Sequence, residues 1–194
     1  MYKIAVLSST GGTNFQSFID AKIQNILDVE ICCLITNKAD CHAVTRAKEA
    51  NIPSHFIDPT GKTREEFDAE VMKTINLYEV DLVVLGGYMR IISEDMVKEY
   101  EGRIINVHPS LLPKHGGEMN KKVHQSVLDA GETETGMTIH YVDKGLDTGS
   151  VISQQSIPVL PEDTADSLRA RVQELEKEWY PRVVQMFSDG TINV

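Results

Sequence analysis

Short apolar, β-branched runs alternate along the first half of the chain with segments of helical periodicity. The apolar runs are KIAVLSS, VEICCLIT, PSHFID, DLVVLGG and RIINVH. Segments with helical spacing follow the first four runs, at about residues 14–25, 42–50, 64–78 and 93–100. Nearly continuous apolar strands that alternate with helices are typical of βαβ units on a parallel sheet covered on both faces. The pattern therefore predicts an α/β, Rossmann-like open twisted sheet that is mostly parallel.

The pattern changes after Pro113. A loop, KHGGEMNKK, precedes a helix expected near residues 123–130, then two strands, GMTIHYVD and SVISQQSIPV, and a long helix at about residues 164–187. The two late strands are expected to extend the sheet in a mixed arrangement. Asp163, Thr164 and Asp166 fit the start of the last helix, because polar caps and acids suit the positive end of a helix dipole. We expect one domain over residues 1–194, with a nucleotide-binding-like half at 1–108 and a second half at 109–194 that holds this loop and the C-terminal elements.

Composition and charge narrow the class of protein. The 194 residues carry a formal charge of −10, which opposes non-specific binding to nucleic acid because phosphate contacts need clustered Lys and Arg. No apolar run approaches the roughly 18 residues that cross a bilayer, and no export signal precedes the first strand. The cysteines at 32, 33 and 41 fit neither a disulfide framework nor a zinc pattern. We expect a cytoplasmic protein with small-molecule partners and no nucleic-acid or membrane partner.

Small and polar residues stand where the predicted strands end. Ligands of open parallel sheets bind beyond the carboxyl ends of the strands, at the switch point between crossovers. The first strand ends in SSTGGTN, residues 8–14, where a close backbone approach and free N–H groups suit a phosphomonoester; a plain tight turn is the alternative. The fourth strand ends in GGYMR, where Arg90 suits a carboxylate or a planar heterocycle.

The fifth strand delivers an amide and an imidazole to the same edge. Strand alternation sends Asn106 and His108 to one side. Asp147 lies in the turn KGLDTG between the two late strands, and its spacing from His108 leaves open whether the two side chains meet. If they meet, the three groups suit acyl transfer to an amine, because amide and imidazolium stabilise an oxyanion and a carboxylate accepts a proton. The histidines show no tight metal-ligand spacing, so no metal is expected.

The segment NVHPSLLP, followed by HYVDKGLDTG, resembles the signature of the folate-dependent formyltransferases. The resemblance implies the formyltransferase fold, catalytic roles for Asn106, His108 and Asp147, and 10-formyltetrahydrofolate as the formyl donor.

The similarity extends from the first strand to the last helix and matches the branch of the family that formylates glycinamide ribonucleotide. It implies that one set of residues binds the phosphate and ribose of this acceptor: Gly11, Gly12, Thr13, Asn14, Arg64, Gln173 and Glu176. It implies that a second set binds the folate: Met89, Arg90, Ile91, Ile92, His140, Val142 and Asp143.

The loop KHGGEMNKKVH departs from the usual form of the family by about three extra residues. His124 is expected to keep the second histidine of that loop, and Lys121 or Lys122 to replace the lost one in part. Thr10-Gly11 and Lys177 also differ from the commoner residues at their positions.

Other readings of the same motifs stay open. The acceptor can instead be methionyl-tRNA, an amino-sugar nucleotide or, in a formyltetrahydrofolate hydrolase, water. The charge of −10 counts against tRNA. A catalytically silent domain that senses a folate or a nucleotide is an alternative of another class. The sequence is compatible with a monomer or a homodimer.

Overall fold

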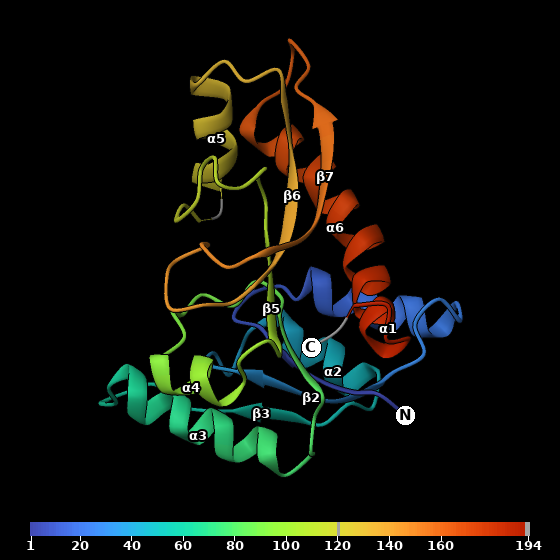
Figure 1. Ribbon diagram of the computed structural model, residues 1–194, viewed down its shortest axis with the longest axis vertical. Coiled ribbons are helices and arrows are strands. Elements are labelled where there is room, and N and C mark those ends of the chain that lie inside the picture. The colour runs from blue at the N-terminus through green and yellow to red at the C-terminus, as the bar shows by residue number, and fades with distance from the viewer. Residues whose placement is uncertain (120, 193–194) are drawn as a thin grey trace.

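The computed structural model describes residues 1–119 and 121–192. All seven of its strands belong to one sheet, in the order β3-β2-β1-β4-β5-β6-β7 (Figure 1). The strands are β1 (Lys3–Leu7), β2 (Glu30–Thr36), β3 (Ser54–Phe56), β4 (Leu82–Leu85), β5 (Ile104–His108), β6 (Glu134–Tyr141) and β7 (Val151–Pro158). The helices are α1 (Thr13–Ile23), α2 (His42–Glu49), α3 (Arg64–Asn76), α4 (Glu94–Glu99), α5 (Lys121–Asp129) and α6 (Ala165–Ser188).

The parallel and antiparallel parts of the sheet follow the change of pattern in the sequence. β1 to β5 pair in parallel. β6 runs antiparallel to β5 and β7 antiparallel to β6, with Asn106 opposite His140. The predicted mostly parallel sheet with a mixed C-terminal extension is therefore confirmed.

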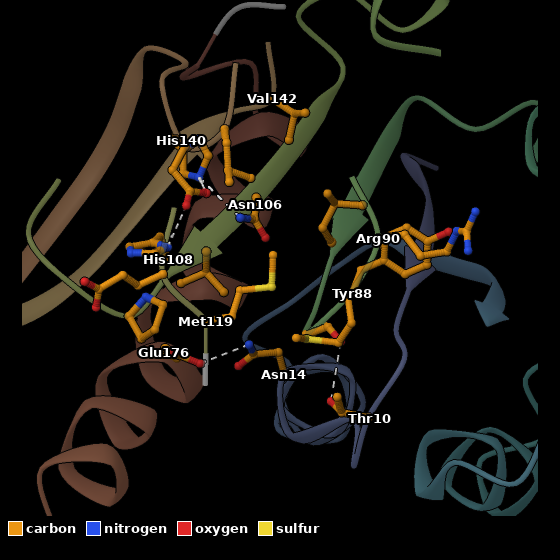
Figure 2. Close-up of a pocket in the computed structure, with 18 of the residues that line it drawn as sticks. Thr10, Asn14, Tyr88, Arg90, Asn106, His108, Met119, His140, Val142 and Glu176 are labelled. Atoms are coloured by element: carbon orange, nitrogen blue, oxygen red, sulfur yellow. Dashed lines mark hydrogen bonds and ion pairs between the residues drawn. The ribbon is translucent and has the colours of Figure 1, made fainter. Parts of the chain in front are cut away.

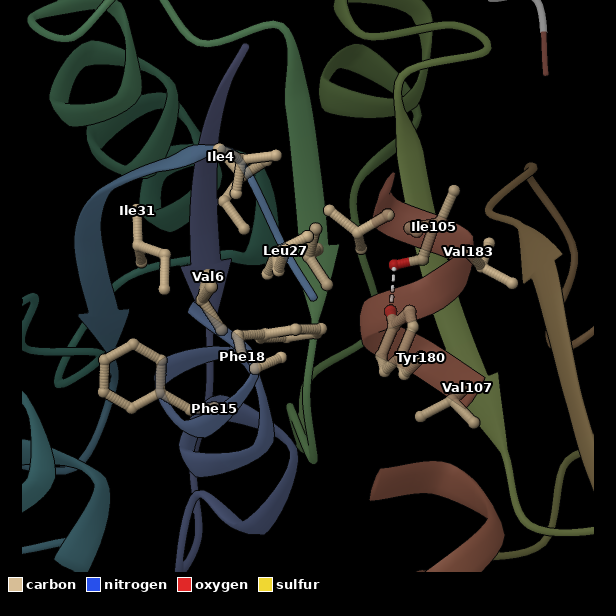
Figure 3. Close-up of a cluster of buried hydrophobic side chains, with 14 of the residues drawn as sticks. Ile4, Val6, Phe15, Phe18, Leu27, Ile31, Ile105, Val107, Tyr180 and Val183 are labelled. Atoms are coloured by element: carbon tan, nitrogen blue, oxygen red, sulfur yellow. Dashed lines mark hydrogen bonds between the residues drawn. The ribbon is translucent and has the colours of Figure 1, made fainter. Parts of the chain in front are cut away.

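Alternate residues of the central strands pack into two separate hydrophobic cores, one on each face of the sheet. Val6 of β1 packs with Phe15 and Phe18 of α1 and with Tyr180 of α6 on one face (Figure 3). Leu7 packs on the other face, in the core that α3 and α4 cover. Burial of both faces explains why these strands are apolar without interruption.

Tyr180 joins α6 to the centre of the sheet. Its hydroxyl lies 2.9 Å from the carbonyl oxygen of Leu85, the last residue of β4, and 3.1 Å from that of Ile105, near the start of β5. The side chain is fully buried and its ring meets Phe18 edge to face, with the ring centroids 5.2 Å apart. This anchor fixes the face of α6 that looks toward the carboxyl edge of the sheet.

The strand order places a switch point between β1 and β4, where the chain has moved from one side of β1 to the other. The turns that follow these two strands touch: Ser9 N donates to Gly87 O at 3.1 Å, and Met89 N donates to Ser9 Oγ at 2.9 Å. The backbone that leaves β4 is therefore held against the turn that leaves β1.

Helix starts follow the capping pattern. Thr164 caps α6, its hydroxyl accepting from Ser167 N while the Ser167 hydroxyl accepts from Thr164 N, as the sequence around 163–166 predicts. α5 begins at Lys121, two residues before the predicted start, because both lysines are good helix formers. In the part of the chain that the structure describes, no helix is long and apolar enough to span a membrane.

Candidate active site

A cavity of about 260 Å³ opens at the carboxyl edge of the sheet. The turns after β1, β4 and β5, the segment between β6 and β7, and the first half of α6 line it. Figure 2 shows side chains from these separate elements converging on one space. The site lies where the switch-point rule places ligands of open α/β sheets.

His108 and Asp147 meet in this cavity. His108 Nδ1 lies 3.1 Å from Asp147 Oδ2, and both side chains are almost fully buried. Asp147 has a positive φ of 56°, and the backbone N–H of Gly117 donates to the same carboxylate oxygen at 2.9 Å. β6 leaves β5 at Tyr141, opposite Ile105, and the segment that follows folds back to bring Asp147 to His108.

Asn106 lies on the same side of β5, as alternation predicts. Its Nδ2 atom lies 3.3 Å from His140 Nε2. His140 Nδ1 donates to the carbonyl of Tyr141 at 2.8 Å, so its Nε2 is free to accept from the amide of Asn106. His140 thus holds the Asn106 amide toward the cavity and also lies 3.6 Å from Asp147 Oδ1.

Both ring nitrogens of His108 face acceptors. Nδ1 faces the Asp147 carboxylate, and Nε2 donates to the carbonyl oxygen of His115 at 3.0 Å. A ring between two acceptors is satisfied only when both nitrogens carry protons. Burial acts to raise the pKa of Asp147, but the hydrogen bond from His108, the nearby His140 ring, the charge of His108 and the Gly117 N–H together hold that pKa well below its usual range. The pair is therefore a buried imidazole hydrogen-bonded to an ionised carboxylate.

Glu176 and Asn14 form a second buried polar pair across the cavity. Asn14 Nδ2 donates to Glu176 Oε2 at 3.0 Å, which joins the start of α1 to α6 (Figure 2). Burial raises the pKa of Glu176 from 4.5 to about 7, although the hydrogen bond from Asn14 opposes the rise. This carboxyl is therefore poised to change its charge near neutral pH.

His124 of α5 also lines the cavity, where the sequence comparison expected the retained histidine of the loop. Burial, and then the charge of Arg169, lower the pKa of His124 from 6.5 to about 4. Its Nδ1 atom is buried and has no hydrogen-bond partner among the residues described. The ring is therefore neutral at physiological pH and keeps one nitrogen for a ligand.

Most residues predicted for the acceptor phosphate and ribose line the cavity: Gly11, Thr13, Asn14, Gln173 and Glu176. Gly12 and Arg64 do not. Gly12 caps α1 with a φ of 67°, and a Cβ there would lie 2.8 Å from the Cβ of Ala43. It shapes the turn and lets α2 approach.

Arg64 lies at the start of α3, on the opposite face of the sheet from α1 and α6. Its Nε donates to Glu65 Oε1 at 3.1 Å, and its charge acts on the buried carboxylate of Asp68, as does that of Arg90. A phosphate contact from Arg64 has no support in this geometry, because helix packing places it beside Asp68 and away from the cavity lining.

The residues predicted for the folate side all line the cavity: Met89, Arg90, Ile91, Ile92, His140, Val142 and Asp143. The Arg90 guanidinium lies over the ring of Phe67, 4.1 Å from its centroid, and its Nε has no partner in the described ranges. Apolar side chains from the β4 turn and the β6–β7 segment give this side of the cavity the character of a slot for a flat ring.

Sequence reasoning missed several lining residues, among them Glu118, Met119 and Arg169. Arg169 stands four residues before Gln173 and seven before Glu176, and this helical spacing could have indicated that it faces the same side of the helix.

The expectation that a lysine of α5 replaces the lost loop histidine is wrong: neither Lys121 nor Lys122 lines the cavity, and Lys121 pairs with Asp166 at 2.5 Å. Asn120 of that loop lies outside the described residues. Within the described ranges no cluster of side chains could hold a metal ion.

Comparisons with known proteins point in one direction. The family profile described as formyl transferase matches residues 2–184. A phosphoribosylglycinamide formyltransferase of Haemophilus influenzae is 38% identical over 100% of this chain and 91% of its own length. The enzyme of the same name from Escherichia coli is 40% identical over 98% of this chain and 89% of its own. The crystal structure of glycinamide ribonucleotide transformylase 1 from Symbiobacterium toebii superposes with a TM-score of 0.95 at 34% identity, covering 100% of this chain and 91% of that one.

Proposed function

The chain belongs to the formyl transferase family, and from this we propose that it transfers the formyl group of 10-formyltetrahydrofolate to the amino nitrogen of N1-(5-phosphoribosyl)glycinamide, in de novo purine biosynthesis. The observation that carries the chemistry is the buried contact of 3.1 Å between His108 and Asp147, with the Asn106 amide beside it. Near full-length similarity to enzymes named for this acceptor supports the choice of substrate.

The reaction begins when the amine nitrogen of the acceptor attacks the formyl carbon. The carbonyl oxygen becomes an oxyanion, and Asn106 Nδ2 and a ring N–H of His108 are the donors that stabilise it. His108 Nε2 points at the carbonyl of His115 in this structure, so substrate binding exchanges that acceptor for the formyl oxygen. Asp147 accepts a hydrogen bond from His108 Nδ1 and so fixes the orientation of the ring.

The attacking nitrogen must lose a proton before the intermediate collapses. Asp147 is ionised and accepts this proton, directly or through a water molecule. The bond between the formyl carbon and N10 of the folate then breaks, the proton held by Asp147 passes to N10 directly or through water, and tetrahydrofolate leaves with the carboxylate regenerated. This direct transfer requires no covalent enzyme intermediate.

Each side of the cavity receives one of the two substrates. The turn with Gly11, Thr13 and Asn14, together with Gln173 and Glu176 of α6, receives the ribose phosphate. The slot beside Met89, Ile91 and Ile92, closed by His140, Val142 and Asp143, receives the folate. Asn106, His108 and Asp147 stand between the two sides, where the formyl carbon and the amine must meet.

Spectrophotometric turnover of a 10-formyl folate analogue tests this proposal. The rate is measured alone, with glycinamide ribonucleotide, and with an amino-sugar nucleotide as rival acceptor. Glycinamide ribonucleotide alone should accelerate deformylation. Asn106→Ala should lower kcat by roughly 10²–10³, the usual loss for one oxyanion donor.

Other outcomes overturn separate parts of the proposal. Deformylation without an acceptor, or only with the rival, would refute glycinamide ribonucleotide as the acceptor. The assignment of the catalytic residues would stand. Unchanged turnover in Asn106→Ala would refute the oxyanion role. We further expect a cytoplasmic monomer or homodimer, which size-exclusion chromatography and cell fractionation would examine.

A further inference from the structure

Arg169 differs from the other arginines in having no partner. It is half-buried on α6 and lines the cavity, yet its guanidinium makes no hydrogen bond or ion pair within residues 1–119 and 121–192. The other arginines each contact a carboxylate, an oxygen of a carbonyl or amide group, or an aromatic ring. A partly desolvated guanidinium that faces a cavity without a partner is the arrangement of an anion site.

Its place on α6 joins Arg169 to the acceptor side of the cavity. Arg169, Gln173 and Glu176 follow the i, i+4, i+7 spacing of one helix stripe, and all three line the cavity. The stripe ends at Glu176, which accepts from Asn14 in the turn that begins α1. An anion bound at the N–H groups of this turn would face the stripe.

The other arginines near the site are committed elsewhere. Arg46 Nε donates to the carbonyl of Gly11 at 2.8 Å and its Nη1 to Gln16 at 2.7 Å, on the outer side of the turn. Arg90 stacks on Phe67 in the other core, and Figure 2 shows it on the side of the cavity away from Glu176. Arg64 does not line the cavity.

The charged and titratable groups around Arg169 leave its charge largely uncompensated. Asp166, on which the charge of Arg169 also acts, pairs with Lys121. His124 is neutral at pH 7, since its pKa is lowered to about 4. Glu176 is only partly ionised there, since its pKa is raised to about 7, and it is bonded to Asn14. Glu118 is the remaining acid on this part of the lining.

We propose that Arg169 binds the phosphate of the acceptor nucleotide, opposite the backbone N–H groups of Gly11 to Asn14. This inference rests on the proposed function and gives the phosphate-side arginine a new identity in place of Arg64. A guanidinium can hold two phosphate oxygens at once, and its fixed charge complements the partial charges at the start of α1. Arg169 is therefore a residue that selects phosphorylated over unphosphorylated acceptors.

Steady-state kinetics of Arg169→Met with two acceptors test the proposal. With glycinamide ribonucleotide, KM for the acceptor should rise roughly 10- to 100-fold, in line with loss of a charge-assisted bidentate contact. The KM for the formyl folate should stay within about 2-fold. With the dephosphorylated glycinamide ribonucleoside, the variant and the unaltered enzyme should have equal kcat/KM. Arg169→Lys should recover part of the affinity, because it keeps the charge and loses the fork.

Arg182→Met is the matched control on the same helix, because Arg182 is exposed and pairs with Glu178. It should leave every constant unchanged. A rise in the folate KM, or an equal penalty with the dephosphorylated acceptor, would overturn the assignment. Calorimetric binding of ribose 5-phosphate separates this proposal from the function itself. Loss of that binding in Arg169→Met supports the phosphate site even if glycinamide ribonucleotide is not formylated, and unchanged binding refutes it.

Discussion

His108 Nδ1 and Asp147 Oδ2 lie 3.1 Å apart, although the two residues belong to different parts of the chain. β6 runs antiparallel to β5 and ends at Tyr141, opposite Ile105, so the segment after β6 must fold back along β5 to bring Asp147 to His108. Because Nε2 of the same ring donates to a carbonyl, the ring has acceptors on both sides. The carboxylate and this carbonyl together therefore fix the orientation of the ring.

Asp147→Asn should keep the fold and lose most of the activity. The amide cannot stabilise the imidazolium or accept the proton of the attacking amine, so kcat should fall by roughly 10²–10⁴. The measurement is kcat for glycinamide ribonucleotide, with a thermal melt to confirm folding. Asp129→Asn, an exposed change on α5, serves as control. Activity within a few-fold of the unaltered enzyme would remove Asp147 from the mechanism.

Two neighbouring glycines should respond differently to the same substitution. Gly12→Ala forces a residue with φ of 67° to carry a Cβ 2.8 Å from Ala43, so it should lose stability by more than the roughly 1–2 kcal/mol of left-handed strain alone. Gly11→Ala meets no atom within 4 Å and should melt like the parent. It should instead raise the acceptor KM, because its methyl group enters the turn that receives the phosphate.

Gly61→Ala provides the reference for strain without a clash, since Gly61 has a φ of 72° and open space around its Cα. Urea unfolding of the three variants gives the comparison. Equal losses in Gly12→Ala and Gly61→Ala would show that contact with α2 is unimportant.

Much of this site follows from strand ends in the sequence. Alternation along β5 was enough to place Asn106 and His108 on one side, and the glycine turns after β1 and β4 predicted the switch point. The contact of His108 with Asp147 did not follow from spacing, because it depends on how the segment after β6 folds back over β5. Arg169 was overlooked because a helix pattern does not show which of two nearby arginines faces a cavity: Arg171 pairs with Asp163 instead.

Arg64 is a residue for which a motif match predicted a role that its place in the fold does not support. A matching arginine in the right helix carried the expectation of a phosphate contact, but α3 covers the face of the sheet away from α1 and α6. Side-chain roles carried over by motif depend on which face a helix covers, and apolar periodicity alone does not decide between faces that are both buried.

Tyr180→Phe should cost about 1–2 kcal/mol in the free energy of unfolding. It removes the donor that Leu85 O and Ile105 O share in a dry environment. Tyr2→Phe is the matched control, because the Tyr2 hydroxyl is buried and has no hydrogen-bond partner in the described part of the chain. That control should be neutral or slightly stabilising. Chemical denaturation measures both, and equal effects of the two changes would rule out an anchoring role for the Tyr180 hydroxyl.

The stability of Glu176→Gln relative to the parent should be greater at alkaline pH than at acid pH. Burial raises the pKa of Glu176 from 4.5 to about 7 in the folded state. As pH rises between these values the unfolded chain loses its proton while the folded protein keeps it, so the parent loses stability across this window. At 1.36 kcal/mol per pH unit the loss approaches roughly 3 kcal/mol, complete above pH 7.

Glutamine cannot ionise and can still accept from Asn14, so the variant should not show this loss. Thermal melts at pH 5 and pH 8 give the comparison, with Glu174→Gln, an exposed neighbour on α6, as control. The same difference between variant and parent at both pH values would contradict the buried-carboxyl explanation. If the variant is stabilised at pH 8 but binds the acceptor less well, the buried acid is retained for ribose recognition at the expense of stability, the trade expected of a binding site.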